Sequence, residues 1–172
     1  MGDDLNFDAL YGRYARDVFR FATYLCGNRS DAEDITAETF VRAWTAPERI
    51  EAATVKGYLF TIARNLFLKG IRRTSRHTSL REDLPDPAPA PPSRLEQQAE
   101  LDAVLARLQT LPEVDRAALL MRALDGLPYQ EIATALGISL SSAKVKVHRT
   151  RAVLMKLRTS GPSTQPSNEG SR

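Results

Sequence analysis

The chain has 172 residues, 42% hydrophobic and 26% charged with a net charge of +3, so it can form one medium-sized domain or two small ones. Cys26 is the only cysteine and the two histidines lie far apart, which excludes an intrachain disulfide and a zinc site with ordinary ligand spacing. No apolar run approaches the roughly 18 residues of a membrane span and the acidic N-terminus differs from a signal peptide, so we expect a cytoplasmic protein without a metal or other cofactor.

The first part of the chain is predicted to form three helices. The first has an apolar stripe with spacings of three and four residues, which consists of Phe7, Leu10, Tyr11, Tyr14, Val18, Phe21, Ala22 and Leu25. Gly27 ends this helix, and Ser30 with Glu33 has the capping-box pattern that starts a second one. The buried side of the second helix is expected to consist of Ile35, Phe40, Val41 and Trp44. Pro47 ends it, and a third helical pattern covers residues 55–71.

Residues 76–93 interrupt the helical pattern. Five prolines fall within eight residues of this segment, which excludes a helix and favours an extended spacer. We interpret the segment as a flexible, proline-rich linker between two small domains, over residues 1–75 and 94–158; a disordered stretch between unrelated modules would have the same composition. Residues 159–172 are low in hydrophobicity and are expected to form a disordered tail.

The second domain is also predicted to be helical. A helix over residues 95–108 is followed by one that starts in the capping-box pattern Thr110–Glu113 and ends at Gly126. Two further helices are expected over residues 129–136 and 140–158. Because no segment alternates apolar and polar residues as a strand would, the predicted fold class is all-α.

Charges are strongly segregated along this chain. Residues 31–38 carry four acids and no base, whereas residues 64–76 carry five bases and no acid. Residues 94–137 carry seven acids against four bases, whereas residues 139–158 carry six bases and no acid. Two basic segments, each beside an acidic one, are typical of a protein that contacts DNA at two points and also binds a protein partner. Taken alone, either basic segment fits a solvated helix face equally well.

Residues 130–149 have the pattern of a helix-turn-helix. Ala133 is small enough for close helix packing, Gly137 allows a sharp turn, and Ala143 and Val147 can pack the second helix onto the first. In this motif the second helix lies in the major groove of DNA. The candidate contacts are Ser141, Ser142, Lys144, Val145, Lys146, His148, Arg149 and Arg151. A free-standing transcriptional regulator that binds DNA as a dimer would have the same motif.

The basic segment of the first domain combines cations with aromatic and amide side chains. Its candidate DNA contacts are Tyr58, Asn65, Lys69, Arg72 and Arg73. Such a surface can follow phosphates and capture unpaired bases. From spacing alone, Tyr58 fits the apolar core equally well. The acidic second helix is better suited to a basic protein surface than to DNA.

Three segments, residues 31–44, 56–73 and 108–154, occur in this order and resemble extracytoplasmic-function (ECF) sigma factors of bacterial RNA polymerase. The resemblance implies that the first domain corresponds to sigma region 2, which recognises and opens the minus-10 promoter element. By position, Tyr58 and Asn65 would meet its unpaired strand. The second domain would correspond to sigma region 4 and read the minus-35 element through the helix-turn-helix.

The resemblance also implies the protein partners. Asp31, Asp34 and Glu38 would dock on the beta-prime clamp helices of core RNA polymerase, the beta flap would be a further contact, and an anti-sigma factor would hold the chain inactive. The sequence has no glycine-rich phosphate loop, metal cluster or nucleophile elbow, so we expect a factor that is not an enzyme. A free-standing helix-turn-helix regulator is the alternative.

Overall fold

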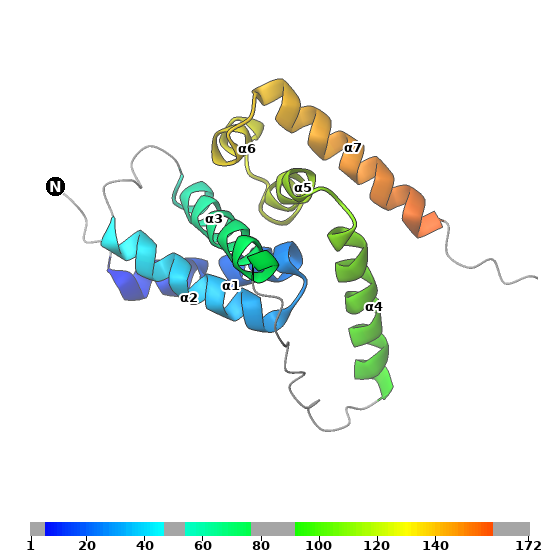
Figure 1. Ribbon diagram of the computed structural model, residues 1–172, viewed down its shortest axis with the longest axis horizontal. Helices are drawn as coiled ribbons and strands as arrows, with labels where there is room; N and C mark the ends of the chain where they lie inside the picture. The colour runs from blue at the N-terminus through cyan, green and yellow to red at the C-terminus, as the bar shows by residue number, and fades with distance from the viewer. Residues whose placement is uncertain (1–5, 47–53, 77–91, 160–172) are drawn as a thin grey trace, which may run out of the picture.

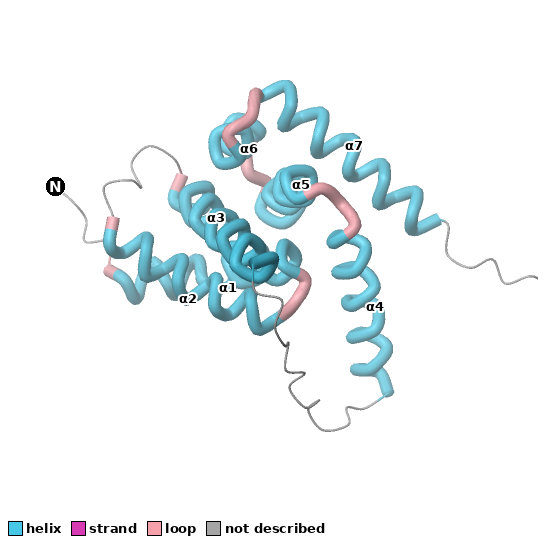
Figure 2. Tube along the Cα trace, in the orientation of Figure 1, coloured by secondary structure: helices cyan, strands magenta, loops and turns pink. Residues whose placement is uncertain are grey.

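A computed structural model gives the fold over residues 6–46, 54–76 and 92–159, apart from the side chains of 72–76, 92 and 157–159. In these ranges the chain forms helices and no strand (Figures 1 and 2), which confirms the all-α prediction. The helices are α1 Phe7–Cys26, α2 Arg29–Thr45, α3 Val55–Arg76, α4 Pro92–Gln109, α5 Glu113–Asp125, α6 Tyr129–Leu136 and α7 Leu140–Thr159.

Helices reach into both ends of the predicted linker, because α3 ends at Arg76 and α4 begins at Pro92. The rest of the predicted linker, the predicted tail beyond residue 159 and Pro47 lie outside the described residues. No helix in the described ranges is long and apolar enough to span a membrane.

Three helices end at the glycines that the sequence indicated. Gly27, Gly126 and Gly137 have φ angles of 83°, 63° and 66°, in the left-handed region. Glycine enters this region without the steric cost that a side chain would add. At Gly27 a Cβ atom would also lie 2.9 Å from the side chain of Gln109, so both the backbone angle and this contact disfavour a larger residue.

Both predicted capping boxes are wrong. Helix α2 begins at Arg29, and its cap is Asn28, whose Oδ1 accepts a hydrogen bond from the Asp31 amide at 2.8 Å. Asparagine caps a helix as well as serine does, and Asn28 lies two positions before the predicted cap Ser30. Helix α5 begins at Glu113 without a side-chain cap. The Thr110 hydroxyl instead donates to the Arg107 carbonyl at 2.7 Å, at the end of the preceding helix.

Helices α1, α2 and α3 pack into a bundle around buried aromatic rings. Phe21 of α1 and Phe60 of α3 are both fully buried and stack with ring centroids 4.5 Å apart. The expected burial of Val41 and Trp44 is wrong, since these side chains are 53% and 50% exposed. The buried face of α2 consists largely of small residues: Ala32, Thr36, Thr39 and Ala43. The two threonine hydroxyls can be buried because they donate to carbonyls one turn earlier, at 2.7 and 2.6 Å.

Helix α5 lies at the centre of the molecule, between α1 and α3 on one side and α7 on the other (Figure 1). Seven consecutive residues of this helix are buried, from Asp115 to Met121. As a result, the buried apolar side chains of both predicted domains form one continuous core. The two predicted domains are therefore packed against each other, and we call this the closed arrangement.

Polar contacts also cross from the first three helices to the last four. Arg64 of α3 makes two hydrogen bonds to the Glu113 carboxylate of α5, at 2.6 and 2.9 Å. The Asp125 carboxylate at the end of α5 is buried and accepts from Lys56 at 3.1 Å and Arg20 at 3.3 Å. These ion pairs join α5 to α1 and to α3.

Candidate nucleic-acid interface

Helices α6 and α7 form the predicted helix-turn-helix. Gly137 turns the chain, and the Ser139 hydroxyl then accepts the Ser142 amide at 3.1 Å, which caps the start of α7. Ala133 of α6 is 2% exposed, and Ala143 and Val147 of α7 are 0% and 1% exposed. These small and apolar residues hold α7 against α6, as the sequence predicted, and α7 also packs against α5.

The opposite face of α7 is open to solvent. The exposed members of the predicted contact set are Ser141, Lys144, Val145, His148, Arg149 and Arg151, whereas Ser142 and Lys146 are half-buried. Val145 is 59% exposed although it is apolar. The His148 ring stacks on Tyr129 of α6, with centroids 6.5 Å apart, so one of its faces is already covered.

Two cations of α7 share one buried carboxylate that the sequence did not indicate. Asp115 of α5 is 4% exposed, and its two oxygens accept from Lys146 at 2.6 Å and from Arg149 at 2.8 Å. Burial alone would raise the pKa of Asp115, but the hydrogen bonds and charges of the two cations outweigh it and lower the pKa below its ordinary value.

This lowered pKa predicts an acid-sensitive contact between α5 and α7. Because the pKa of Asp115 is lower in the folded chain, its stabilising contribution is complete above the ordinary aspartate pKa of about 3.9. It is lost as the pH falls through the folded pKa. We expect Asp115→Asn to reduce the loss of stability between pH 5 and pH 3, measured by urea unfolding. An unchanged pH dependence would contradict the pairing.

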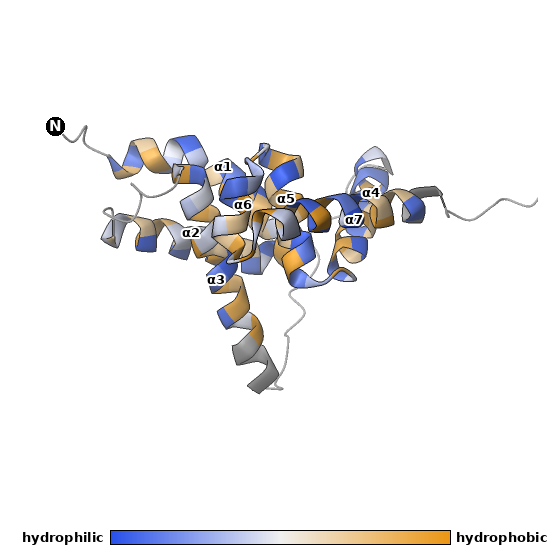
Figure 3. Ribbon diagram, turned by 90° about the horizontal axis from the view of Figure 1, so that it is seen from above, coloured by the Kyte–Doolittle hydropathy of each residue, from blue (hydrophilic) through white to orange (hydrophobic). Residues whose placement is uncertain are grey.

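The basic segment of α3 is only partly free. Asn65 and Lys69 are exposed, whereas Tyr58 is half-buried and packs against the core, with its hydroxyl 3.5 Å from the Ala46 carbonyl. The side chains of Arg72 and Arg73 lie outside the described residues. Helix α3 as a whole extends away from the other helices (Figure 3).

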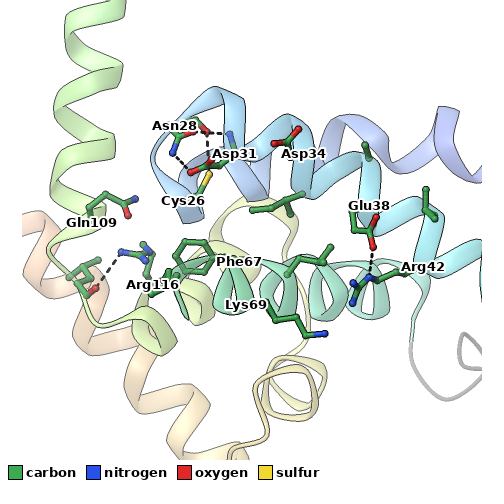
Figure 4. A pocket seen from close by; sticks show the side chains of 17 residues that line it. Cys26, Asn28, Asp31, Asp34, Glu38, Arg42, Phe67, Lys69, Gln109 and Arg116 are labelled. Carbon is green, nitrogen blue, oxygen red and sulfur yellow. Dashed lines mark hydrogen bonds and ion pairs between the residues drawn. The ribbon is translucent and has the colours of Figure 1, made fainter. Parts of the chain in front are cut away.

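A groove runs between α2 and α3 and ends against the α4–α5 turn (Figure 4). The three predicted polymerase contacts, Asp31, Asp34 and Glu38, line its α2 side. Asp34 is exposed, whereas Asp31 accepts from the Asn28 side-chain amide at 2.6 Å and Glu38 pairs with Arg42 at 2.7 Å. Apolar residues from both helices also line the groove: Ile35, Val41, Leu66, Phe67 and Ile71. The groove therefore combines an acidic edge on α2 with an apolar lining, and Arg42, Lys69 and Arg116 also line it.

Cys26 lies at one end of this groove and is half-buried. Its thiol donates to the Asn28 carbonyl at 3.2 Å, and burial raises the pKa of the thiol above its ordinary value. Because the thiolate is the reactive form, we expect iodoacetamide at pH 8.5 to label the folded chain several-fold more slowly than the chain in urea. Mass spectrometry measures the rate without ambiguity, because Cys26 is the only cysteine. Equal rates would show a reactive thiol instead.

A helix-turn-helix and a separate basic helix thus occur in one helical chain. Residues 10–77 match sigma-70 region 2, and residues 101–154 match sigma-70 region 4. Together these regions define the class of protein, which is that of the RNA polymerase sigma factors.

Comparison with relatives narrows the class. The chain is 33% identical over 161 residues to the ECF sigma factor SigL of Mycobacterium tuberculosis, covering 89% of both chains. It is 28% identical to the ECF sigma factor SigM of Bacillus subtilis, covering 91% of this chain and 98% of SigM. It is 38% identical to the ECF sigma factor SigE of Mycolicibacterium smegmatis, although it spans only 60% of that relative. The chain belongs to the ECF sigma factors.

Solved structures share the fold. The sigma factor RpoE of Bartonella quintana, in complex with the anti-sigma factor NepR, superposes with a TM-score of 0.71 at 22% identity, over 91% of this chain and 99% of RpoE. The protein CnrH, in complex with the cytosolic domain of CnrY, gives a TM-score of 0.69 at 23% identity, over 94% of this chain and 92% of CnrH.

Proposed function

We propose that this chain binds core RNA polymerase and directs it to one class of promoters, with α7 reading the minus-35 element. The observation that carries the proposal is the open face of α7. There Lys144 and Arg149 offer hydrogen-bond donors for guanine or phosphate, and Val145 offers an apolar contact for a thymine methyl group. The match to region 4 supports the same assignment.

The first domain recognises and opens the minus-10 element. Asn65 and Lys69 are exposed on α3, where an amide and an ammonium group can hold an unpaired base and its phosphate. Unpairing and extruding a base costs a few kcal/mol, which such contacts can offset. Tyr58 joins this contact only if its half-buried ring turns outward. We propose that Arg72 and Arg73 contact phosphates of the DNA next to this unpaired base.

The groove between α2 and α3 is the surface through which this chain binds the polymerase. Its acidic edge suits a basic protein surface such as the clamp helices of the beta-prime subunit, and its apolar lining can bury a helix face. A single helix-turn-helix makes few DNA contacts, so the free chain binds DNA weakly. Attachment to the polymerase joins the two DNA contacts into one stronger interaction. The beta flap would support region 4 on the same assembly.

We further propose that the chain is held inactive by an anti-sigma factor. Two solved neighbours of the same fold are complexes, one with the anti-sigma factor NepR and one with the cytosolic domain of CnrY. The chain itself breaks no covalent bond, and its role places it with the polymerase in the cytoplasm. The matches to region 2 over residues 10–77 and to region 4 over residues 101–154 support our division into domains at 1–75 and 94–158.

Transcription in vitro tests this function. Core polymerase would transcribe a fragment library of the source genome with and without the chain, and the 5′ ends would be mapped. We expect new start sites that share two upstream elements, and about tenfold less transcript with Arg149→Ala, since a good base contact contributes about 1–3 kcal/mol. Arg107→Ala, an exposed arginine of α4, is the matched control. Tight binding of duplex DNA by the chain alone, without dependent start sites, would favour the free-standing regulator.

A further inference from the structure

The buried carboxylate of Asp115 divides its two cations into different roles. Lys146 and Arg149 are three positions apart on α7, so they lie one turn apart on the same side of the helix. The Lys146 side chain is 24% exposed, and its ammonium group lies against the carboxylate. The Arg149 side chain is 59% exposed although one of its terminal nitrogens is bound. Asp115 therefore buries much of Lys146 but leaves most of Arg149 in solvent.

The contact to Arg149 fixes a direction as well as a charge. A guanidinium group is planar, so holding Nη2 on the Asp115 oxygen at 2.8 Å restricts the plane of the whole group. Its remaining donors lie on the same planar fork. The carboxylate of Asp115 is itself held in place, because Asp115 lies in the first turn of α5, whose residues from 115 to 121 are all buried. The orientation of the Arg149 guanidinium group therefore depends on a carboxylate that is fixed in the core.

We infer that Asp115 is a positioning residue for promoter recognition: it holds Arg149 in the orientation in which its free donors meet a base pair of the minus-35 element. The inference rests on the proposed function, in which α7 reads that element. Asp115 itself does not touch DNA, because it is 4% exposed and lies behind α7. A preset arginine loses less side-chain freedom on binding and accepts fewer geometries, which sharpens the choice of base pair.

A purely structural role for Asp115 gives a different result. If the carboxylate only holds α7 against α5, its loss weakens recognition of every base pair to the same extent. If it positions Arg149, its loss weakens the choice at the base pair that Arg149 reads and leaves the other positions unchanged. The preference at each position of the element therefore separates the two roles.

The experiment uses the full chain with core polymerase and a set of promoters in which each minus-35 base pair is replaced in turn. We expect Arg149→Ala to abolish the preference at one or two adjacent base pairs. Asp115→Asn should reduce the preference at the same base pairs about fivefold, on the scale of one base contact, and add nothing in the Arg149→Ala background. Asp102→Asn, an exposed acid of α4, is the matched control.

Asp115→Glu keeps the charge and shifts the carboxylate by one methylene group, so it tests positioning even if Asp115→Asn folds poorly. We expect it to change the preference at the Arg149 base pairs. Preferences that fall uniformly, or that do not change in either variant while Arg149→Ala changes them, would overturn the inference. If the unaltered chain starts no transcription from promoters with these elements, the proposed function fails instead, which is a separate outcome.

Discussion

Phe60→Ala is expected to destabilise the chain by about 3–5 kcal/mol, the cost of emptying a buried aromatic site. Phe60 is fully buried and stacks on Phe21 with ring centroids 4.5 Å apart, so the cavity would open between α1 and α3. A chain of this size has a total stability of only about 5–15 kcal/mol, so the loss is a large part of it. Urea unfolding followed by circular dichroism measures the change.

The continuous core adds a second expectation for the same variant. Because α5 is packed against α1 and α6 against α3, the loss at Phe60 should lower the stability of α5, α6 and α7 as well, in a single transition. Ile71→Ala on the same helix is the control, since Ile71 is 47% exposed and its truncation should have little effect. Two separate transitions, with only the first one shifted, would show that the two predicted domains unfold independently.

Local features of this fold could be predicted from the sequence because they depend on neighbouring residues. Gly27, Gly126 and Gly137 marked helix ends at which only glycine adopts the backbone angles without strain. The helix-turn-helix followed from small and apolar residues at fixed spacings, and the structure buries Ala143 and Val147. These patterns act within a few residues, so a single sequence shows them.

Contacts between distant residues could not be predicted in the same way. Asp115 lies 34 residues from Arg149, and Glu113 lies 49 residues from Arg64. An acid in the first turn of α5 is expected in any case, because it interacts favourably with the helix dipole, so neither carboxylate stands out. The burial of Asp115 depends on the packing of α7 against α5. The same holds for Trp44, which packs edge-on against Phe7 of α1 with ring centroids 5.7 Å apart and stays 50% exposed.

One signal for the closed arrangement was present in the sequence. Residues 117–121 are Ala-Ala-Leu-Leu-Met, a run of five apolar residues that covers every side of a helix. A helix that is apolar all round is buried on more than one face. In the structure α6 and α7 of the same domain cover part of α5, and α1 covers a further face, so this apolar run is buried by both halves of the chain.

Glu113→Arg is expected to open the closed arrangement. In the structure Arg64 makes two hydrogen bonds to Glu113, with side chains only 12% and 18% exposed, so the substitution would place two guanidinium groups against each other. Loss of one partner of a buried ion pair costs about 3–5 kcal/mol, and we expect about 2–4 kcal/mol here because both groups keep some contact with water. Small-angle scattering should show a larger radius of gyration, and α3 and α5 should exchange amide hydrogens faster.

The charge-swapped variant Glu113→Arg with Arg64→Glu separates the ion pair from the other role of Glu113. The swap restores opposite charges between α3 and α5, so the radius of gyration should return to that of the unaltered chain. Stability should return only in part, because an arginine in the first turn of α5 loses the favourable interaction with the helix dipole, about 0.3–1 kcal/mol. If Glu113→Arg leaves the radius of gyration unchanged, the apolar core alone holds the two halves together and the ion pair contributes little to the closed arrangement.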